Sequence, residues 1–179
     1  MQPMPIKYSS REFILPNSPT ELITSVKLVL DHIDQQLAGL EYKHEIYFKT
    51  KSIVTELLTN AIKHAGTKSV TIHIITDNEY LTIKKNEHGE PFPLVKDSSP
   101  GEKKKLSFDI MHSLYAINES NNTLKFIVED NAIDKPDIDG VAEHFGLLIV
   151  TKCAEQFIYY YDEDNKLNTF TAKLRIPRP

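Results

Sequence analysis

The sequence predicts an α/β chain built as a two-layer α+β sandwich, in which a mixed β-sheet carries helices on one face. Three observations favour this architecture. Two long segments in the first third of the chain place apolar residues at helical spacing. Two later segments alternate apolar and polar residues as β-hairpins do, and a further helical segment lies between them. Strands and helices in this order suit a single sheet that buries one face under helices.

The first half of the chain gives the clearer elements. Apolar spacing ends at Gly39 in the first helical segment and at Gly66 in the second, and glycine is a common C-terminal signal of helices. Strict alternation after Gly66 then replaces the helical period. The expected elements are a tail at residues 1–11, a strand at 12–15, helices at 20–39 and 44–65, and a hairpin at 70–83 with its turn at 76–79.

The second half is less regular at first. Pro91, Pro93 and Pro100 prevent a continuous regular element there. We therefore expect a long lid or insertion at about residues 93–140, because segments of this length without regular structure are usually functional or disordered. Within and after it, the expected elements are a short helix at 106–115, a strand at 123–128, a helix at 141–154, and a closing hairpin of strands 156–161 and 168–176.

Length and composition bound the class of protein. The chain has 179 residues, which predicts one domain at residues 12–179. Its formal charge of -4 disfavours nucleic acid as the main partner. Cys153 is the single cysteine, so neither an internal disulfide nor a cysteine metal cluster is expected. No apolar run is long enough to cross a bilayer, so we expect no membrane association and a cytoplasmic location.

The stretch ELLTNAIKHA, residues 56–65, carries the candidate chemistry. On a helix, Glu56, Asn60 and Lys63 share the face opposite the apolar one. The Asn60 oxygen is a suitable ligand for Mg²⁺, and Glu56 could accept a proton from a nucleophile that approaches a phosphate. Lys63 could neutralise phosphate charge, and His64 lies near the negative helix end. The alternative is an ordinary solvated helix face.

Residues 56–64 resemble the N-box of the GHKL ATPase superfamily, most closely the branch of anti-sigma factors that are serine/threonine protein kinases. The resemblance implies the histidine kinase-like ATPase (Bergerat) fold and a site for ATP and Mg²⁺. In that family the N-box asparagine binds Mg²⁺ and the glutamate is the general base. By resemblance these roles fall on Asn60 and Glu56, with Lys63 and His64 beside them in the nucleotide site.

Two further motifs resemble the glycine motifs of that family. Residues 87–92, EHGEPF, are similar to the motif that recognises adenine, which implies that role for Glu87 and Gly89, with glutamate where aspartate is usual. Residues 144–150, HFGLLIV, are similar to the motif that covers the phosphates, which implies that role for Gly146 and Leu147. His144 stands where the family has a glycine, and its Cβ opposes close approach of backbone amides to phosphate.

A rival position for the adenine motif lies at residues 126–132. There Asp130 would be the adenine acceptor, and Ala132 would replace the glycine. We prefer Glu87 because the hairpin follows the N-box directly, which is the family order.

The resemblance implies an ATP-dependent kinase that acts on Ser or Thr of a regulatory partner, with a sigma factor or an antagonist protein as the typical partner. The altered glycine motifs leave open a second function, a binding module that keeps the fold without turnover. A hydrolase with His64, His73 and His88 as metal ligands finds no support, since their spacing is not compact. A second copy of the chain stays open as a partner.

Overall fold

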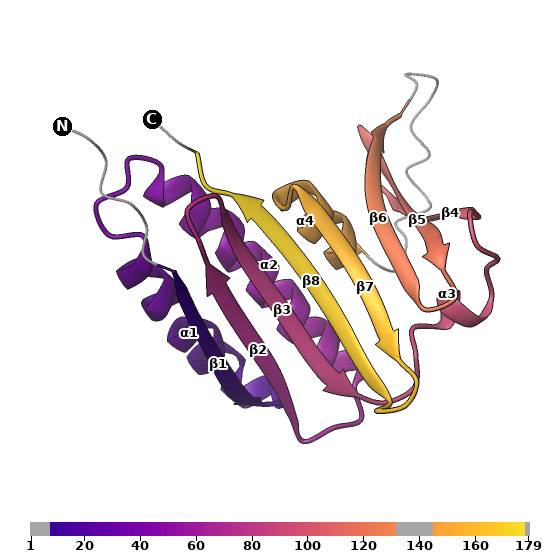
Figure 1. Ribbon diagram of the computed structural model, residues 1–179, viewed down its shortest axis with the longest axis horizontal. Helices are drawn as coiled ribbons and strands as arrows, with labels where there is room; N and C mark the ends of the chain where they lie inside the picture. The colour runs from indigo at the N-terminus through magenta and orange to yellow at the C-terminus, as the bar shows by residue number, and fades with distance from the viewer. Residues whose placement is uncertain (1–7, 132–144, 178–179) are drawn as a thin grey trace.

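One eight-stranded sheet dominates the computed structural model, which describes residues 8–131 and 145–177. Its strand order is β1-β2-β3-β8-β7-β6-β5-β4 (Figure 1). All seven pairings between neighbouring strands are antiparallel, so the expectation of a mixed sheet is wrong. The strands are β1 Ser9–Pro16, β2 Ser69–Thr76, β3 Tyr80–His88, β4 Lys103–Phe108, β5 His112–Ser120, β6 Thr123–Asp130, β7 Gln156–Asp162 and β8 Leu167–Arg175.

Helices cover one face of this sheet, as the sequence predicts. Figure 1 shows α1, α2 and α4 behind the sheet, with its opposite face turned to the viewer. None of the described helices is long and apolar enough to span a membrane. The helical elements are the 3-10 turn η1 Pro19–Glu21 and the helices α1 Leu22–Gln36, α2 Lys43–His64, α3 Pro93–Lys96 and α4 Phe145–Cys153.

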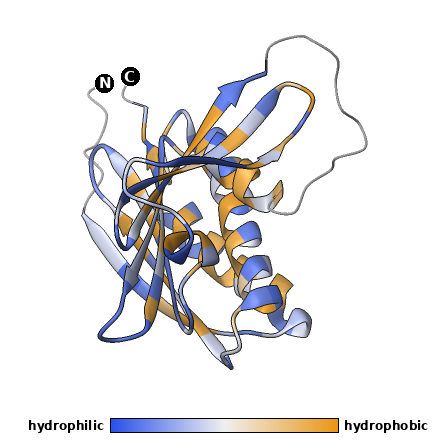
Figure 2. Ribbon diagram, turned by 90° about the vertical axis from the view of Figure 1, so that its right-hand side faces the viewer, coloured by the Kyte–Doolittle hydropathy of each residue, from blue (hydrophilic) through white to orange (hydrophobic). Residues whose placement is uncertain are grey.

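The core lies between the two layers, and Figure 2 shows hydrophobic residues along both. On β3 the alternate residues Leu81 and Ile83 are fully buried, while their neighbours Thr82 and Lys84 are half-buried on the other face. Burial of such a side chain stabilises the fold by roughly 1.5–3 kcal/mol. The period-two pattern of the strands therefore fixes which sheet face receives the helices.

The sequence predicts the N-terminal half well. The strand at 12–15, the helices at 20–39 and 44–65 and the hairpin at 70–83 are confirmed as β1, η1 with α1, α2, and β2 with β3. The closing hairpin is confirmed as β7 and β8, and the strand at 123–128 as β6. Of the helix expected at 141–154, the described part is helical from Phe145 to Cys153, and residues 132–144 lie outside the described residues.

The expected helix at 106–115 is wrong, because this segment forms the end of β4, a turn and the start of β5. Leu114, Ala116 and Asn118 alternate into the buried face, and β5 pairs with β6 along nearly its whole length. Residues 103–130 thus extend the sheet by three strands where an irregular lid was expected. Pairing with β6, the next strand along the chain, lies outside the segment 106–115 and overrides its local helical pattern.

The three added strands join the sheet through a short contact. β6 pairs with β7 only from Thr123↔Tyr160 to Phe126↔Phe157, and its second half continues without β7. α4 contacts β4, β5 and β6 on one side and α2 on the other. α4 therefore bridges the added strands and the N-terminal helices.

Candidate functional site

Glu56 and Asn60 lie one turn apart on α2, and both are half-buried. Val54 and Leu58, which are 0% and 3% exposed, hold the opposite side of α2 in the core. This packing fixes the rotation of the helix. It directs Glu56 and Asn60 toward Gly146 of α4, so these two side chains are not on a fully solvated helix face.

Gly146, from the predicted phosphate motif, lies next to Glu56 and Asn60. A Cβ built on Gly146 would lie 2.3 Å from Oε2 of Glu56 and 3.7 Å from Nδ2 of Asn60. A Cβ this close would displace the Glu56 carboxylate, so the absence of a side chain at position 146 leaves room for that carboxylate between α2 and α4. Three of the residues predicted for the phosphate side of a nucleotide site are thereby in one cluster.

Leu147, the next residue, faces the core instead. Its side chain is 4% exposed, and its carbonyl accepts a hydrogen bond from the Thr151 hydroxyl at 2.7 Å. Its side chain therefore anchors α4. His144, on which the departure from the glycine motif depends, lies outside the described residues.

Lys63 and His64 are exposed in the last turn of α2. That end is capped by the Asn17 amide, whose Nδ2 lies 3.1 Å from the carbonyl oxygen of Ala61 and 3.0 Å from that of Ala65. The Lys63 cation near the C-terminal end of the helix also complements its dipole. Sequence reasoning missed Asn17, which comes from a loop 44 residues before Ala61.

Glu87 lies on the helix-facing side of β3 and is paired with a lysine. Its Oε2 accepts a hydrogen bond from Lys85 Nζ at 2.7 Å, and the side chains of Lys85 and Glu87 are 2% and 11% exposed. Lys85 Nζ also lies 4.4 Å from the ring centroid of Phe170 on β8. Burial lowers the pKa of Lys85, and the neighbouring carboxylate of Glu87 opposes that shift.

Sequence reasoning missed Lys85, although a signal was present. Leu81, Ile83 and Lys85 occupy successive inward positions of β3, so the alternation places this lysine on the buried face. A lysine in that series needs an acidic partner, and Glu87 is the next inward residue.

Gly89 follows directly after β3, and its φ of 154° is an angle that residues other than glycine rarely adopt. Its N–H donates to the Lys166 carbonyl at 3.0 Å, and its carbonyl accepts the Tyr161 hydroxyl at 3.4 Å. A Cβ would meet nothing closer than Asn168 Nδ2 at 3.8 Å, so backbone conformation, not space, selects glycine here.

A buried polar chain holds the segment after Gly89 against β7 and β8. The Phe92 N–H donates to the Tyr159 hydroxyl at 2.8 Å, and that hydroxyl donates to Asn168 Oδ1 at 2.6 Å. Asn168 Nδ2 completes the chain at the Glu90 carbonyl, 3.1 Å away. Burial raises the pKa of Tyr159 to about 12, so the phenol stays protonated and able to donate.

The Phe92 ring fills the space beside this chain. Its centroid lies 6.4 Å from that of Phe126, 5.8 Å from that of Tyr159 and 6.4 Å from that of Phe170. Sequence reasoning had no means of finding this cluster, because its members come from three strands and from the loop before α3.

Asp130, the rival adenine acceptor, is remote from these residues. It ends β6, three places from β3 in the sheet order, and its side chain is 95% exposed. The Nε2 atom of His112 lies 3.7 Å from Oδ1 of Asp130. The structure therefore does not bring Asp130 together with the α2 residues.

A second polar cluster, also missed from the sequence, joins α4 to the β4–β5 turn. Lys152 Nζ lies 3.3 Å from Asp109 Oδ2 and 3.1 Å from His112 Nδ1. Desolvation would raise the pKa of Asp109, but hydrogen bonds from the N–H groups of Met111 and His112, and then from Lys152, lower it to about 2. This cluster fixes the added strands to α4.

The described residues contain no cluster of histidines or carboxylates suited to binding a metal ion. Residues 8–131 and 145–177 contain no group of three or more His, Cys, Asp or Glu side chains that could hold a metal ion. A cation at Glu56 and Asn60 would need oxygen ligands from a bound molecule or water to complete its shell.

Two surface hollows lie elsewhere. One, of about 250 Å³, is lined by Lys49, Cys153 and Arg175 among others, and the second, of about 520 Å³, lies around Tyr160 and the β5–β6 turn. Neither is lined by Glu56, Asn60 or Glu87.

Comparison of the chain with models of known protein families gives no match, and a search of curated proteins finds no significant relative.

Proposed function

We propose that this protein binds Mg·ATP where α2 meets α4 and transfers the γ-phosphate to a Ser or Thr of a partner protein, as a member of the GHKL type with the Bergerat fold. The observation that carries the proposal is the cluster of Glu56, Asn60 and Gly146. These residues come from two motifs about 90 residues apart that were assigned, by resemblance, to the same end of a nucleotide.

The residues present fit the phosphate end of such a ligand. Gly146 lies in the first described turn of α4, where a position without Cβ lets backbone N–H groups come close to an anion. Asn60 offers the amide oxygen that Mg²⁺ accepts as a ligand. Mg·ATP supplies the transferable phosphoryl group together with the cation that offsets its charge.

Within this site Glu56 is proposed as the general base. It is half-buried and lies beside Gly146, and this position supports the role of accepting a proton from a hydroxyl nucleophile near the phosphate. Its carboxylate takes the hydroxyl proton as the oxygen attacks. Lys63, exposed at the end of the same helix, adds positive charge at the rim, and the exposed His64 imidazole beside it offers a hydrogen-bond partner. By the same resemblance, the partner is a sigma factor or an antagonist protein in the cytoplasm.

Recognition of the adenine base is proposed for Glu87 and Gly89. The buried carboxylate of Glu87 has one oxygen occupied by Lys85, and a second oxygen remains to accept from an amino group. Lys85 acts as a positioning residue, because its Nζ donates to one carboxylate oxygen of Glu87.

A second candidate, a binding module without turnover, is favoured by a different observation. The Phe92 ring packs among Phe126, Tyr159 and Phe170, and Glu87 is engaged by Lys85. These side chains thus already contact one another beside the proposed adenine site. In this alternative the fold is kept and the protein acts by contact with its partner.

Calorimetric titration with Mg·ATP separates the two candidates. The wild type should bind, and Asn60→Ala should weaken binding at least about tenfold, the loss of roughly 1.4 kcal/mol of interaction. Asn121→Ala, at an exposed turn position, is the matched control and should bind like the wild type. A wild type that is folded yet takes up no nucleotide would favour the binding module.

Transfer is tested next with Glu56→Gln, which keeps the size and shape of the side chain beside Gly146. We expect this variant to bind Mg·ATP and to lose phosphate transfer to a Ser-containing partner by about 10²–10⁴-fold, the usual contribution of a general base. Unchanged transfer would remove Glu56 from the role of base.

A further inference from the structure

The sheet face opposite α1, α2 and α4, which is turned to the viewer in Figure 1, is crossed by basic side chains. The strand registers place one row of residues on this face, perpendicular to the strands: His73, Lys84, Thr171, Ile158, Lys125, Ile117 and Lys103. Lys173 on β8 lies in the adjoining row, opposite Thr82 of β3. Three strand spacings separate Lys84 on β3 from Lys125 on β6, which puts their backbones about 14 Å apart.

The lysines in the middle of this face have no carboxylate partner. Within the part of the chain that the structure describes, Lys84, Lys125 and Lys173 form no ion pair. Lys173 Nζ lies 3.9 Å from the ring centroid of Tyr80, so its stem extends along the face. All three lysines are half-buried, because their stems lie on the sheet while the ammonium groups reach water.

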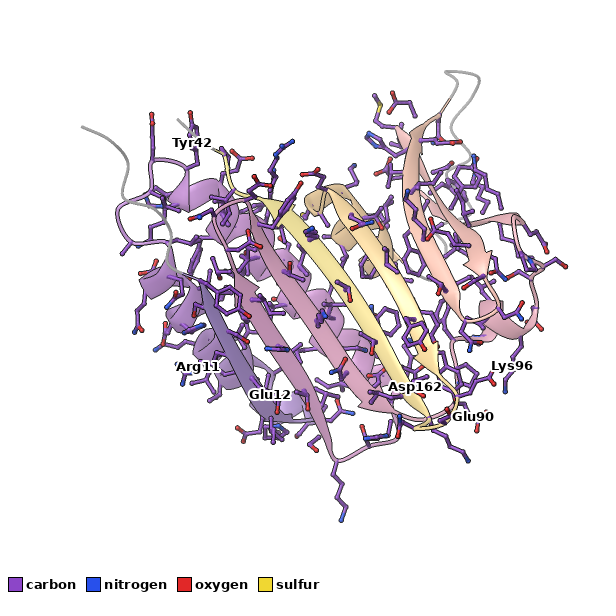
Figure 3. The ribbon with its side chains drawn as sticks, viewed as in Figure 1. Arg11, Glu12, Tyr42, Glu90, Lys96 and Asp162 are labelled. Atoms are coloured by element: carbon purple, nitrogen blue, oxygen red, sulfur yellow. The ribbon has the colours of Figure 1, made fainter. Side chains whose placement is uncertain are left out.

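The carboxylates on this face lie at its margins or are already paired. Glu12 is on the edge strand β1, and Asp162 is the last residue of β7 (Figure 3). Glu119 is the last residue but one of β5. Glu129 Oε1 accepts a hydrogen bond from Lys103 Nζ at 2.6 Å. The middle of the face is therefore positively charged, although the formal charge of the whole chain is -4.

A hollow of about 520 Å³ adjoins this basic region at the β5–β6 turn. Its lining residues include Ser120, Asn122, Tyr160 and the carboxylate-bearing Glu119. The Tyr160 side chain is 47% exposed. Tyr160 is opposite Thr123, two residues from Lys125 on the same face of β6, so the ring and this lysine are diagonal neighbours.

We propose that this face binds single-stranded nucleic acid, with backbone phosphates along Lys84, Lys173 and Lys125 and one base stacked on Tyr160 in the hollow. Lysines that neutralise phosphates give affinity without regard to sequence, and stacking of a base on an aromatic ring adds to it. The hydroxyl of Ser120 and the amide of Asn122 offer donors and acceptors to the edge of that base.

Two features favour nucleic acid over an acidic segment of a protein. The hollow presents a tyrosine ring beside hydrogen-bonding groups, which suits a planar base, whereas a chain of carboxylates has no ring to stack. The lysines cross the strands in two adjoining rows, which suits a linear chain of phosphates whose bases are unstacked. The surface lies on the sheet face opposite the helices that carry Glu56 and Gly146, so the inference does not depend on the proposed Mg·ATP site.

Fluorescence anisotropy tests the proposal with labelled oligo(U) and oligo(dT) of about 15 nucleotides at about 50 mM salt. The wild type should bind one or both, more weakly as the salt concentration rises. Lys84→Glu and Lys125→Glu should each weaken binding about tenfold and reduce the slope of log affinity against log salt by about 1. Tyr160→Ala should weaken binding roughly 5- to 150-fold, the loss of one stacked base.

The matched control is Lys27→Glu, the same change at an exposed lysine of α1, and it should bind like the wild type. Circular dichroism verifies that each variant is folded, and either lysine variant of the face suffices if the other fails to fold. A wild type that binds neither oligonucleotide overturns the proposal, as do folded Lys84→Glu and Lys125→Glu variants that bind like the wild type. An equal loss in Lys27→Glu, or displacement of the oligonucleotide by an equal amount of polyglutamate, also overturns it.

Discussion

Substitution of Gly146 by alanine tests the contact on which the proposed site depends. In a helix, alanine is more favourable than glycine by up to about 1 kcal/mol. Here the new Cβ would lie 2.3 Å from Glu56 Oε2, so the carboxylate must move by about an ångström or more to reach ordinary contact. Because that atom is the end of a flexible side chain, we expect the displacement of Glu56 to offset most of the helical gain.

The expected result is a free energy of unfolding within about 0.5 kcal/mol of the wild type for Gly146→Ala. In a Glu56→Ala background the obstacle is gone, and the same substitution should stabilise by about 0.5–1 kcal/mol. Urea unfolding of the four proteins of this double-mutant cycle measures the difference. The same gain from alanine in both backgrounds would mean that Glu56 does not contact position 146, and the reasoning about the site would be refuted.

Three other substitutions follow from buried polar contacts. Lys85→Met should lower the free energy of unfolding in urea by roughly 3–5 kcal/mol, because it leaves the Glu87 carboxylate buried without its cation. The double variant Lys85→Met with Glu87→Leu should recover much of that loss. A single variant as stable as the wild type would contradict the buried pair. Tyr159→Phe should cost about 1–3 kcal/mol, because the Phe92 N–H and Asn168 lose their partner; a smaller loss would show that water replaces the hydroxyl. The lowered pKa of Asp109 adds stability that is fully present above its unfolded value of 3.8 and is lost as the pH falls toward 2. Asp109→Asn should therefore reduce the loss of unfolding free energy between pH 4 and 2 by about 1–2 kcal/mol, after allowance for solvent screening. Identical profiles of stability against pH for the variant and the wild type would exclude the shift.

The elements that the sequence predicts correctly are those whose packing is local or strongly periodic. α2 carries apolar residues at helical spacing over 22 residues, and β2 and β3 alternate strictly around a short turn. In these segments one burial direction decides the structure. The failure at residues 106–115 has the opposite cause, since β5 is stabilised by a neighbour strand and by α4, and neither is visible in a ten-residue window.

The candidate site shows the same division. Glu56 and Asn60 were found from their spacing on one helix, and Gly146 from its motif. Their contact depends on the crossing of α2 and α4, which only the packed structure sets. The Lys85–Glu87 pair could be predicted from the alternation of inward and outward residues on β3. The chain from Phe92 through Tyr159 and Asn168 to Glu90 was not, because its members are far apart in the sequence.

By itself, the sequence determined the identity and order of most helices and strands, the face of each that is buried, and a helix with a carboxylate, an amide, a lysine and a histidine in its last turns. Periodicity is sufficient for this, because burial of apolar surface acts on each element separately. Only the tertiary structure decided that the sheet is antiparallel throughout, that residues 103–130 extend it, and that Gly146 lies against Glu56. These features depend on contacts between distant segments, whose free energy exists only once the chain is folded.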